Sequence, residues 1–508
     1  MKRMKMKRIN LTYTIAVLSL VILLGSCQKR LDLFPFNAIE LSQSFKTVKD
    51  ASTWNGGLYA DLRGRTYGSY MFATDVQADQ LNASLDFGNR NGNPHRWGQS
   101  FLAEDGLLSG IWSGYYFALR NVNAAIAGFE NVQTTSPAEA DSLRRFKADN
   151  FFARAHYYHQ LVQRFAKAYN PATANADLGV PLVLTYDINA LPARATVKQV
   201  YDQILADIAS AKSNATGAAA RTNTQGAMRV TLDAILALEA RVKLDMQDWA
   251  GAIAAANAVI SSNRYPLVNT LTDLRNMWVN DLPREVIMRL AVIRQNENPN
   301  TNNIYLGFNA ANNRFTPDFI PSQWMIDLYD AADIRKQVYF GAKAVLIQGI
   351  QYPNMVLVDK YPGNPALFTT AATNYQHTPI LFRVAELYLI VAEAGANAGG
   401  AAAIDATNRL NELRAARGLT PIVATGAALV QAARDERTRE LAFEGFRLQD
   451  LKRWGLGFTR RAPQNINAIN VGDNYERLSV PANDPKFVWG IPTNDISINP
   501  NLVQNPGW

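Results

Sequence analysis

Apolar residues recur at helical spacing through much of the chain. Over residues 107–129, Trp112, Tyr116, Leu119, Val122 and Ile126 fall on one stripe at intervals of three and four positions. Such a stripe predicts a helix that buries one face. Similar patterns predict helices over 44–62, 196–211, 225–246 and 249–261.

The most informative stretch is RTRELAFEGFRLQDLKRWG, residues 437–455. Leu441, Leu448, Leu451 and Trp454 recur there at spacings of three and seven. This spacing predicts two helices that share one inward apolar stripe and are separated by a short break at Gly445.

Opposite charges in this stretch are spaced three residues apart, as Arg437–Glu440, Glu444–Arg447 and Asp450–Arg453. Such pairs can meet along one helix, and a solvated ion-pair face is the common interpretation of the pattern. Here, however, the charges alternate with Phe443, Phe446 and Trp454. We therefore predict a half-buried charge network at a seam between structural units, where it specifies geometry more than it adds stability.

Two regions lack helical periodicity. Residues 63–99 are rich in Gly, Asn, Arg and aromatic residues, and 263–379 are rich in Asn, Pro and Tyr, with candidate short strands at 285–293 and 352–361. Loops on a rigid scaffold often carry binding residues. We predict a mainly α fold, in which a tetratricopeptide-like spine of helical hairpins, each roughly 34–40 residues long, carries a large irregular lobe with a few short strands.

The charge distribution argues against a nucleic-acid partner. The 508-residue chain has a formal net charge of +8, but five positive charges lie in the first 26 residues, which hold no acidic residue, and the remainder carries +3. We find no other basic block with interleaved aromatic residues, which is the expected footprint of nucleic-acid binding.

The N-terminus predicts export and lipidation. A basic start is followed by the apolar run LTYTIAVLSLVILL and then by Leu24, Gly25, Ser26 and Cys27, the only cysteine of the chain. The run is short for a membrane span, and the pattern is typical of a signal peptide. Small residues before a cysteine resemble a bacterial lipobox, so we expect cleavage before Cys27 and acylation of its thiol. An ordinary signal peptide with an incidental cysteine is the alternative.

Several segments resemble the SusD/RagB family of outer-membrane nutrient-uptake lipoproteins. Besides 437–455, the resemblance covers 31–40, 150–184, 378–418 and the C-terminal segment. The matching residues are Arg154, Ala155, Tyr157, Tyr158, Leu161, Phe165, Val180, Pro181, Leu182, Arg383, Glu386, Tyr388, Glu393, Ala394, Asn408, Leu410, Asn411, Arg414, Gly418, Ile491, Pro492, Asn499, Pro500 and 504–507.

The resemblance implies a SusD-like fold with a helix early in 150–184 and a helical hairpin over 378–418. We therefore expect a signal peptide over 1–26 and one domain over 27–508. Its spine would cover 40–62, 107–262 and 379–455, its ligand-binding lobe 63–106 and 263–378, and its C-terminal segment 456–508. Family members often carry acidic residues after the cysteine, which favour export to the cell surface. Here Gln28, Lys29 and Arg30 follow the cysteine instead, so the sequence does not decide which leaflet of the outer membrane holds the anchor.

Sequence motifs give little support for catalysis or metal binding. His156 and His159 could share a metal, but we find no third ligand at suitable spacing. Asp75 and Asp79 are the kind of carboxylate pair that a glycosidase uses, although any large protein offers many such pairs. We find no nucleophile elbow, phosphate-binding glycine loop or His-Glu-x-x-His motif, and we expect neither a metal nor a cofactor other than the lipid.

Aromatic and planar polar residues in the irregular regions are the candidate ligand contacts. An aromatic ring packs on the apolar face of a sugar while polar side chains bind its hydroxyls. Trp97 is the leading candidate, because it follows Asn91, Asn93 and Arg96 in a Gly-rich loop. The candidates are Tyr67, Asn93, Arg96, Trp97, Trp278, Tyr305 and Trp324, and core packing is the alternative for each ring. We assign Trp112 and Trp249 to the core.

The resemblance implies a noncatalytic protein, lipid-anchored in the outer membrane and facing the cell surface. It would bind a glycan and deliver it to a SusC-like TonB-dependent transporter. The alternatives are a surface glycoside hydrolase and a SusD-like binder of peptide or glycoprotein, because aromatic residues and Asn serve either ligand.

Overall fold

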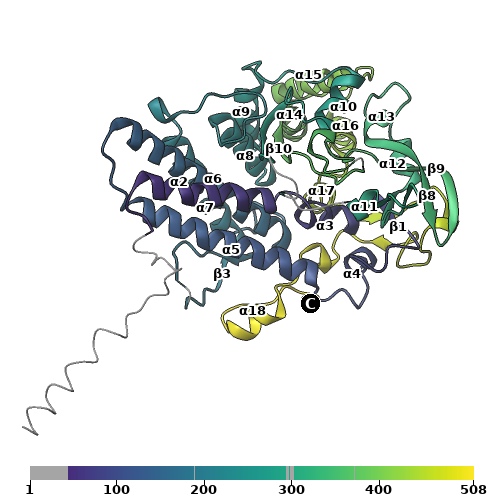
Figure 1. Ribbon diagram of the computed structural model, residues 1–508, viewed down its shortest axis with the longest axis horizontal. Coiled ribbons are helices and arrows are strands. Elements are labelled where there is room, and N and C mark those ends of the chain that lie inside the picture. The colour runs from purple at the N-terminus through teal and green to yellow at the C-terminus, as the bar shows by residue number, and fades with distance from the viewer. Residues whose placement is uncertain (1–43, 188, 293–296, 298–301, 371) are drawn as a thin grey trace, which may run out of the picture.

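The computed structural model describes residues 44–508 except 188, 293–296, 298–301 and 371, so the predicted signal segment and Cys27 lie outside the described residues. The molecule is mainly α-helical (Figure 1). Its helices are α2 (Val48–Gly64), α3 (Ser69–Gln77), α4 (Gly92–Arg96), α5 (Gly106–Phe129), α6 (Pro137–Phe165), α7 (Val197–Asn214), α8 (Leu232–Asp245), α9 (Trp249–Ile260), α10 (Leu271–Val279), α11 (Asn302–Tyr305), α12 (Gln323–Asp327), α13 (Lys336–Tyr339), α14 (Val384–Ala398), α15 (Gly400–Ala416), α16 (Gly426–Glu440), α17 (Arg447–Trp454) and α18 (Thr493–Ile498). Within the described part of the chain, none of these helices has both the length and the apolar character of a membrane span.

The helices α2, α5, α6 and α7 form the first bundle. The longest, α6, packs against the other three. Local signals fix where these helices begin: the side chain of Asp105 accepts a hydrogen bond from Leu107 N, and Thr196 and Gln199 form a capping box. Such caps satisfy backbone N–H groups that have no partner within the helix.

A second stack is built from α8, α9, α14, α15 and α16. Helix α14 lies at its centre and packs against the other four. Small residues allow close approach: a Cβ on Gly395 would lie 2.5 Å from the carbonyl oxygen of Ala402 in α15. The helices α14 and α15 are joined at Gly399 and Gly400, both with positive φ, which glycine adopts readily.

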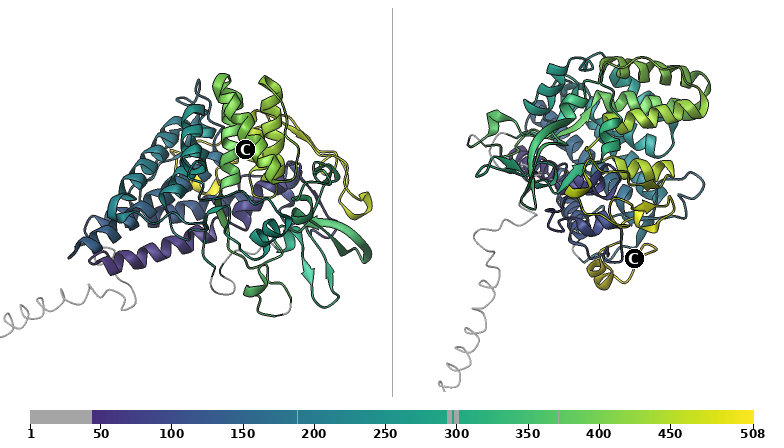
Figure 2. Two further views of the ribbon diagram at one scale, coloured as in Figure 1. Left: turned by 90° about the horizontal axis from the view of Figure 1, so that it is seen from above. Right: turned by 90° about the vertical axis from the view of Figure 1, so that its right-hand side faces the viewer.

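Strands β1, β8 and β9 lie on the side of the molecule opposite the first bundle, whereas β2 and β3 pack against α7 of that bundle (Figures 1 and 2). The strands β5, β6, β8 and β9 form one sheet in that order, and β8 and β9 form a hairpin through Gln348 and Gly349, whose positive φ angles suit a tight turn. Strand β1 pairs with β7, which joins the two irregular regions of the sequence. The strands are β1 (Leu81–Ala83), β2 (Leu178–Pro181), β3 (Arg194–Thr196), β4 (Val286–Arg289), β5 (Phe308–Asn309), β6 (Arg314–Phe315), β7 (Phe319–Pro321), β8 (Phe340–Ile347), β9 (Ile350–Val358), β10 (Ile380–Arg383), β11 (Phe458–Thr459) and β12 (Ser479–Val480).

The mainly α fold with a hairpin spine and an irregular lobe is confirmed, and so are the strands predicted within 285–293 and 352–361. The irregular regions nevertheless contain more helix than their patterns indicated, notably α3 and α10. In α3, every residue from Met71 to Gln77 is buried. A helix surrounded by protein shows no polar face, so its sequence carries no amphipathic stripe.

Candidate functional site

A buried charge network joins the spine to the lobe. Glu440, at the end of α16, contacts Arg335 at 2.8 Å, Arg417 at 2.7 Å, and Arg383. All four side chains are buried. Burial alone would raise the pKa of Glu440. The guanidinium groups of Arg417, Arg383 and Arg335 nevertheless hold this pKa well below its ordinary value. The network therefore stays ionised and fixes how the two parts of the molecule meet.

Two of the three local ion pairs predicted in 437–455 do not form. Asp450 and Arg453 do contact each other at 2.9 Å. Arg437 instead pairs with Asp450 at 2.8 Å. Glu444 pairs with Lys360 and with Arg383, and Arg447 pairs with Asp79 at 2.7 Å. Partners distant in the sequence replace local ones because the segment is enclosed, and the network is more deeply buried than we predicted.

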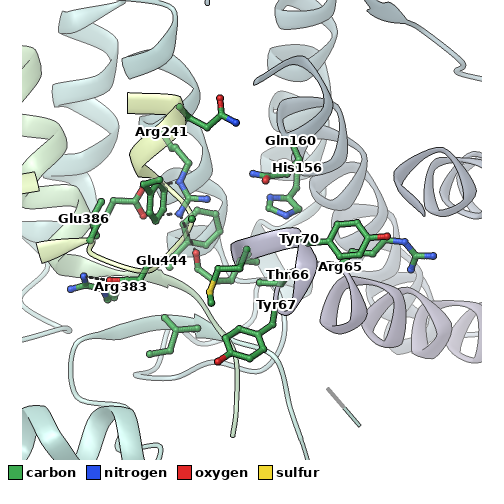
Figure 3. A pocket seen from close by; sticks show the side chains of 18 of the residues that line it. Arg65, Thr66, Tyr67, Tyr70, His156, Gln160, Arg241, Arg383, Glu386 and Glu444 are labelled. Carbon is green, nitrogen blue, oxygen red and sulfur yellow. Dashed lines mark hydrogen bonds and ion pairs between the residues drawn. The ribbon is translucent and has the colours of Figure 1, made fainter. Parts of the chain in front are cut away.

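An internal cavity of about 100 Å³ lies beside this network (Figure 3). Arg241 binds Glu386 through two hydrogen bonds of 2.6 and 2.7 Å, and Arg383 binds Glu444 on the same wall. Ligand pockets usually span about 300–1,000 Å³, so this cavity is too small for a sugar chain. Its charged walls suit a few water molecules better.

Four aromatic candidates are buried in the core. The ring of Trp97 packs between Phe458 and Phe487, and its Nε1 donates to the carbonyl oxygen of Gln77 at 2.7 Å. The exposed fractions are 8% for Trp97, 3% for Tyr67, 4% for Trp278 and 1% for Tyr305. These rings therefore present no open face to a ligand in this conformation, and core packing accounts for them.

Tyr67, Trp278 and Tyr305 lie together in the core of the lobe. Tyr67 packs edge-on against His377 at 4.4 Å between ring centroids, and the Lys360 ammonium lies 4.2 Å from the Trp278 ring. Tyr305 donates to Asp75 at 3.4 Å. The structure thus brings these three together around the seam rather than on a surface.

Asn93 and Arg96 belong to a separate, half-buried cluster. Arg96 donates to Asn93 Oδ1 at 2.8 Å and to the hydroxyl of Tyr475 at 3.0 Å. Asn93 donates in turn to Asp105 at 3.3 Å. These contacts hold the loop around α4, and their role in ligand binding stays a prediction.

Trp324 is the aromatic candidate that reaches a surface groove. We call this the tryptophan groove, which has a volume of about 650 Å³. It is lined by Asp79, Trp324, Leu328, Gln431, Arg434, Asp435, Thr438, Arg447, Leu451, Trp454, Leu456, Gly457, Phe458, Thr459, Arg461, Ser479, Val480, Pro481 and Ala482. Hydrogen bonds hold both indoles by their edges, from Trp324 Nε1 to the carbonyl oxygen of Asp79 and from Trp454 Nε1 to Glu393.

Trp454 was not among the predicted ligand contacts. Its spacing from Leu448 and Leu451 placed it on an inward stripe, and those two leucines are indeed buried. Trp454 itself is half-buried and also lines a second groove of about 860 Å³. Trp454 is the last residue of α17 and stands directly before Gly455. This position at a helix end is the sequence signal that could have indicated that its ring is not fully buried.

The carboxylate pair considered for glycoside hydrolysis is held structurally. Asp75 is fully buried and accepts a hydrogen bond from Gly445 N at 2.9 Å, which fixes the break before α17. Burial raises the pKa of Asp75 to about 8. Asp79 is bound by two donors of the Arg447 side chain, at 2.7 and 2.9 Å. Asp75 is therefore closed off from a sugar, and Asp79, which lines the tryptophan groove, has both oxygens bound by Arg447.

The histidines considered for a metal site have other surroundings. His159 Nε2 lies 2.7 Å from Asp245, and His156 faces the internal cavity. Over the residues that the structure describes, no group of three or more His, Cys, Asp or Glu side chains is placed to hold a metal ion.

Comparison with known proteins gives consistent relatives. The model of the SusD family matches residues 341–508, and a model described as starch-binding and associating with the outer membrane matches 55–244. SusD-like protein P38 of Formosa agariphila is 23% identical, with 99% of each chain covered. The starch-binding protein SusD of Bacteroides thetaiotaomicron is 36% identical over 140 residues, which are 26% of this chain and 22% of that protein.

Solved structures agree on the fold. A SusD superfamily protein from Bacteroides thetaiotaomicron superposes with a TM-score of 0.77 at 24% identity, over 91% of this chain and 100% of that one. At this identity the similarity establishes the arrangement of helices and strands, and leaves the ligand open.

Proposed function

The chain belongs to the SusD/RagB family, and from this premise we propose that it is a noncatalytic outer-membrane protein that binds a glycan in the tryptophan groove. It would pass the glycan to a SusC-like TonB-dependent transporter. Acylation of Cys27 would hold the protein at the membrane, because several acyl chains together give lasting attachment.

The shape and lining of the tryptophan groove carry the proposal. Its volume of about 650 Å³ lies within the usual range for ligand sites. Two half-buried indoles, Trp324 and Trp454, add apolar surface to the groove, against which a sugar ring can pack. Beside them, the hydroxyls of Thr459 and Ser479 lie 2.9 Å apart and can bind sugar hydroxyls. The groove thus combines stacking surface with hydrogen-bonding groups.

Binding of a glycan panel tests this proposal. We expect Trp324→Ala to weaken the tightest interaction at least about tenfold, because a central aromatic contact in a groove typically dominates binding. The control is Trp54→Ala, which removes a half-buried indole that lines neither groove. Unchanged affinity in Trp324→Ala would contradict the assignment of the groove.

The same incubations test the noncatalytic role. We expect bound polysaccharide to keep its number of reducing ends over the whole incubation, because Asp75 and Asp79 are engaged within the protein. New reducing ends would instead identify a hydrolase.

A further inference from the structure

We propose that the tryptophan groove selects an anionic glycan, one that carries carboxylate or sulfate groups. This inference rests on the proposed function and names the ligand class of the same site. It starts from the arginines of the groove and from the groups that surround them.

Three arginines line the groove, and they differ in their partners. The charge of Arg447 is already paired within the protein, because its Nε and Nη2 both donate to Asp79. Arg461 is exposed and lies over the Trp324 ring, with its guanidinium carbon 5.0 Å from the ring centroid. Arg434 lies over the Trp454 ring at 5.3 Å. Across the described residues, neither Arg434 nor Arg461 has a carboxylate within ion-pair distance.

The neighbouring carboxylates do not neutralise these two arginines. Glu393 attracts Arg434 but is already bound by Arg453 and by the indole of Trp454. Asp435 also lines the groove and accepts a hydrogen bond from Gln431 at 2.7 Å. Once the Arg447–Asp79 pair is set aside, the groove wall therefore holds two guanidinium groups against one carboxylate.

Arg434 also carries a donor that no group in the described part of the chain satisfies. The Nε of Arg434 is buried and has no hydrogen-bond partner among the described residues. A buried donor left unpaired is destabilising.

The position of these arginines over the indoles suits recognition of an oxyanion. A guanidinium group that lies over an indole keeps its in-plane N–H donors available, and these match the two oxygens of a carboxylate or sulfate. The ring also restricts the arginine side chain before the ligand arrives, which reduces the entropy lost on binding. Sugar rings would meet the indole surface that the arginines leave uncovered, and oxyanions would bind the arginines of the same groove.

Matched pairs of glycans test the proposal on the full-length protein in detergent. Calorimetry compares oligogalacturonate with its carboxyl-reduced neutral form, and a carrageenan oligosaccharide with its desulfated form. We expect at least one charged member to bind about tenfold or more tightly than its neutral partner, with affinity that falls as salt rises. The carboxylate and sulfate arms identify which oxyanion is preferred.

Groove variants sharpen the test. Arg461→Gln is expected to lower the ratio of charged to neutral affinity about tenfold, whereas Asp435→Asn raises it. The control is Arg477→Gln, which removes the same charge from an exposed arginine that does not line the groove.

The possible outcomes separate the two proposals. Charged and neutral members that bind equally, or a ratio that Arg461→Gln leaves unchanged, would overturn the anionic ligand class. If neutral glycans still bind and Trp324→Ala still weakens them, the proposed function stands and the inference alone fails. If Trp324→Ala affects no glycan, both fail.

Discussion

Asp75 illustrates at the scale of one residue how enclosure changes an ionisable group. Its carboxyl is fully buried between α3 and the break at Gly445, and burial raises its pKa to about 8 despite the hydrogen bond from Gly445 N. In the unfolded chain the pKa is near 3.8. Between these values the folded protein holds a proton that the unfolded chain releases.

This proton makes stability depend on pH with a definite sign. From this group alone, the free energy of unfolding should fall as pH rises from about 4 to 8, by up to about 1.4 kcal/mol per pH unit. The buried His95 and His156, whose pKa values are lowered by burial, contribute in the opposite direction below about pH 6.5. Asp75→Asn, which mimics the neutral carboxyl, should remove this contribution. In urea titrations between about pH 4.5 and about pH 7.5, its free energy of unfolding should therefore change more positively with pH than that of the unaltered protein. Asp202→Asn changes an exposed carboxylate and serves as the control. Equal slopes in the Asp75→Asn variant and the unaltered protein would contradict the prediction.

At the scale of elements, the effect of a helix glycine on stability depends on whether a neighbouring helix packs against it. Gly395 in α14 packs against α15, where a Cβ would lie 2.5 Å from Ala402 O and 2.8 Å from the Cβ of Ala406. Gly110 lies in α5, and a Cβ added there would have no neighbouring atom within 4 Å. Intrinsic helix propensity favours alanine over glycine at both positions.

We therefore predict opposite outcomes for one substitution at two sites. Gly110→Ala should stabilise the protein by roughly 0.5–1 kcal/mol, because alanine loses less backbone entropy on folding. Gly395→Ala should destabilise it by about 1–3 kcal/mol, because the two helices must separate to admit the methyl group. Urea denaturation of the two variants measures both, and stabilisation by Gly395→Ala would show that α15 can move away.

Amphipathic elements were predictable from sequence, and enclosed ones were not. The stripe through Trp112 and Leu119 predicted α5 almost to its ends, since one face of that helix is buried and the other is wet. Helix α3 is enclosed on all sides and offers no such alternation. The ion-pair partners of Glu440 and Arg447 lie 23 to 368 residues away, beyond the reach of spacing rules within one helix.

At the scale of the whole molecule, the tryptophan groove also could not be predicted from local sequence patterns. Trp324 and Trp454 come from α12 and α17, and only the folded chain brings them to one wall. Local composition favoured Trp97 instead, because its loop is rich in Gly and Asn, but that loop is closed over by Phe458 and Phe487. The sequence included Trp324 among its candidates but did not rank it above the buried rings, and it assigned Trp454 to an inward stripe.

The proposed membrane attachment gives a prediction for the intact chain. Cys27→Ser should move the protein from the membrane fraction to the soluble fraction, because the serine hydroxyl would not be acylated. Fractionation with labelled palmitate measures both effects. Gly25→Ala keeps a small residue before the cysteine and should retain the label. Cys27→Ser protein that stays in the membrane would contradict the anchor.

The order of charges along the chain has a consequence for biosynthesis. Arg335, Arg383 and Arg417 all precede Glu440, the carboxylate that they share. A nascent chain released before α16 is made would leave these cations short of their common counter-ion inside an apolar seam. Final closure of the lobe onto the spine must therefore await the last part of translation, and a prematurely terminated product should be recognised by proteases as incomplete.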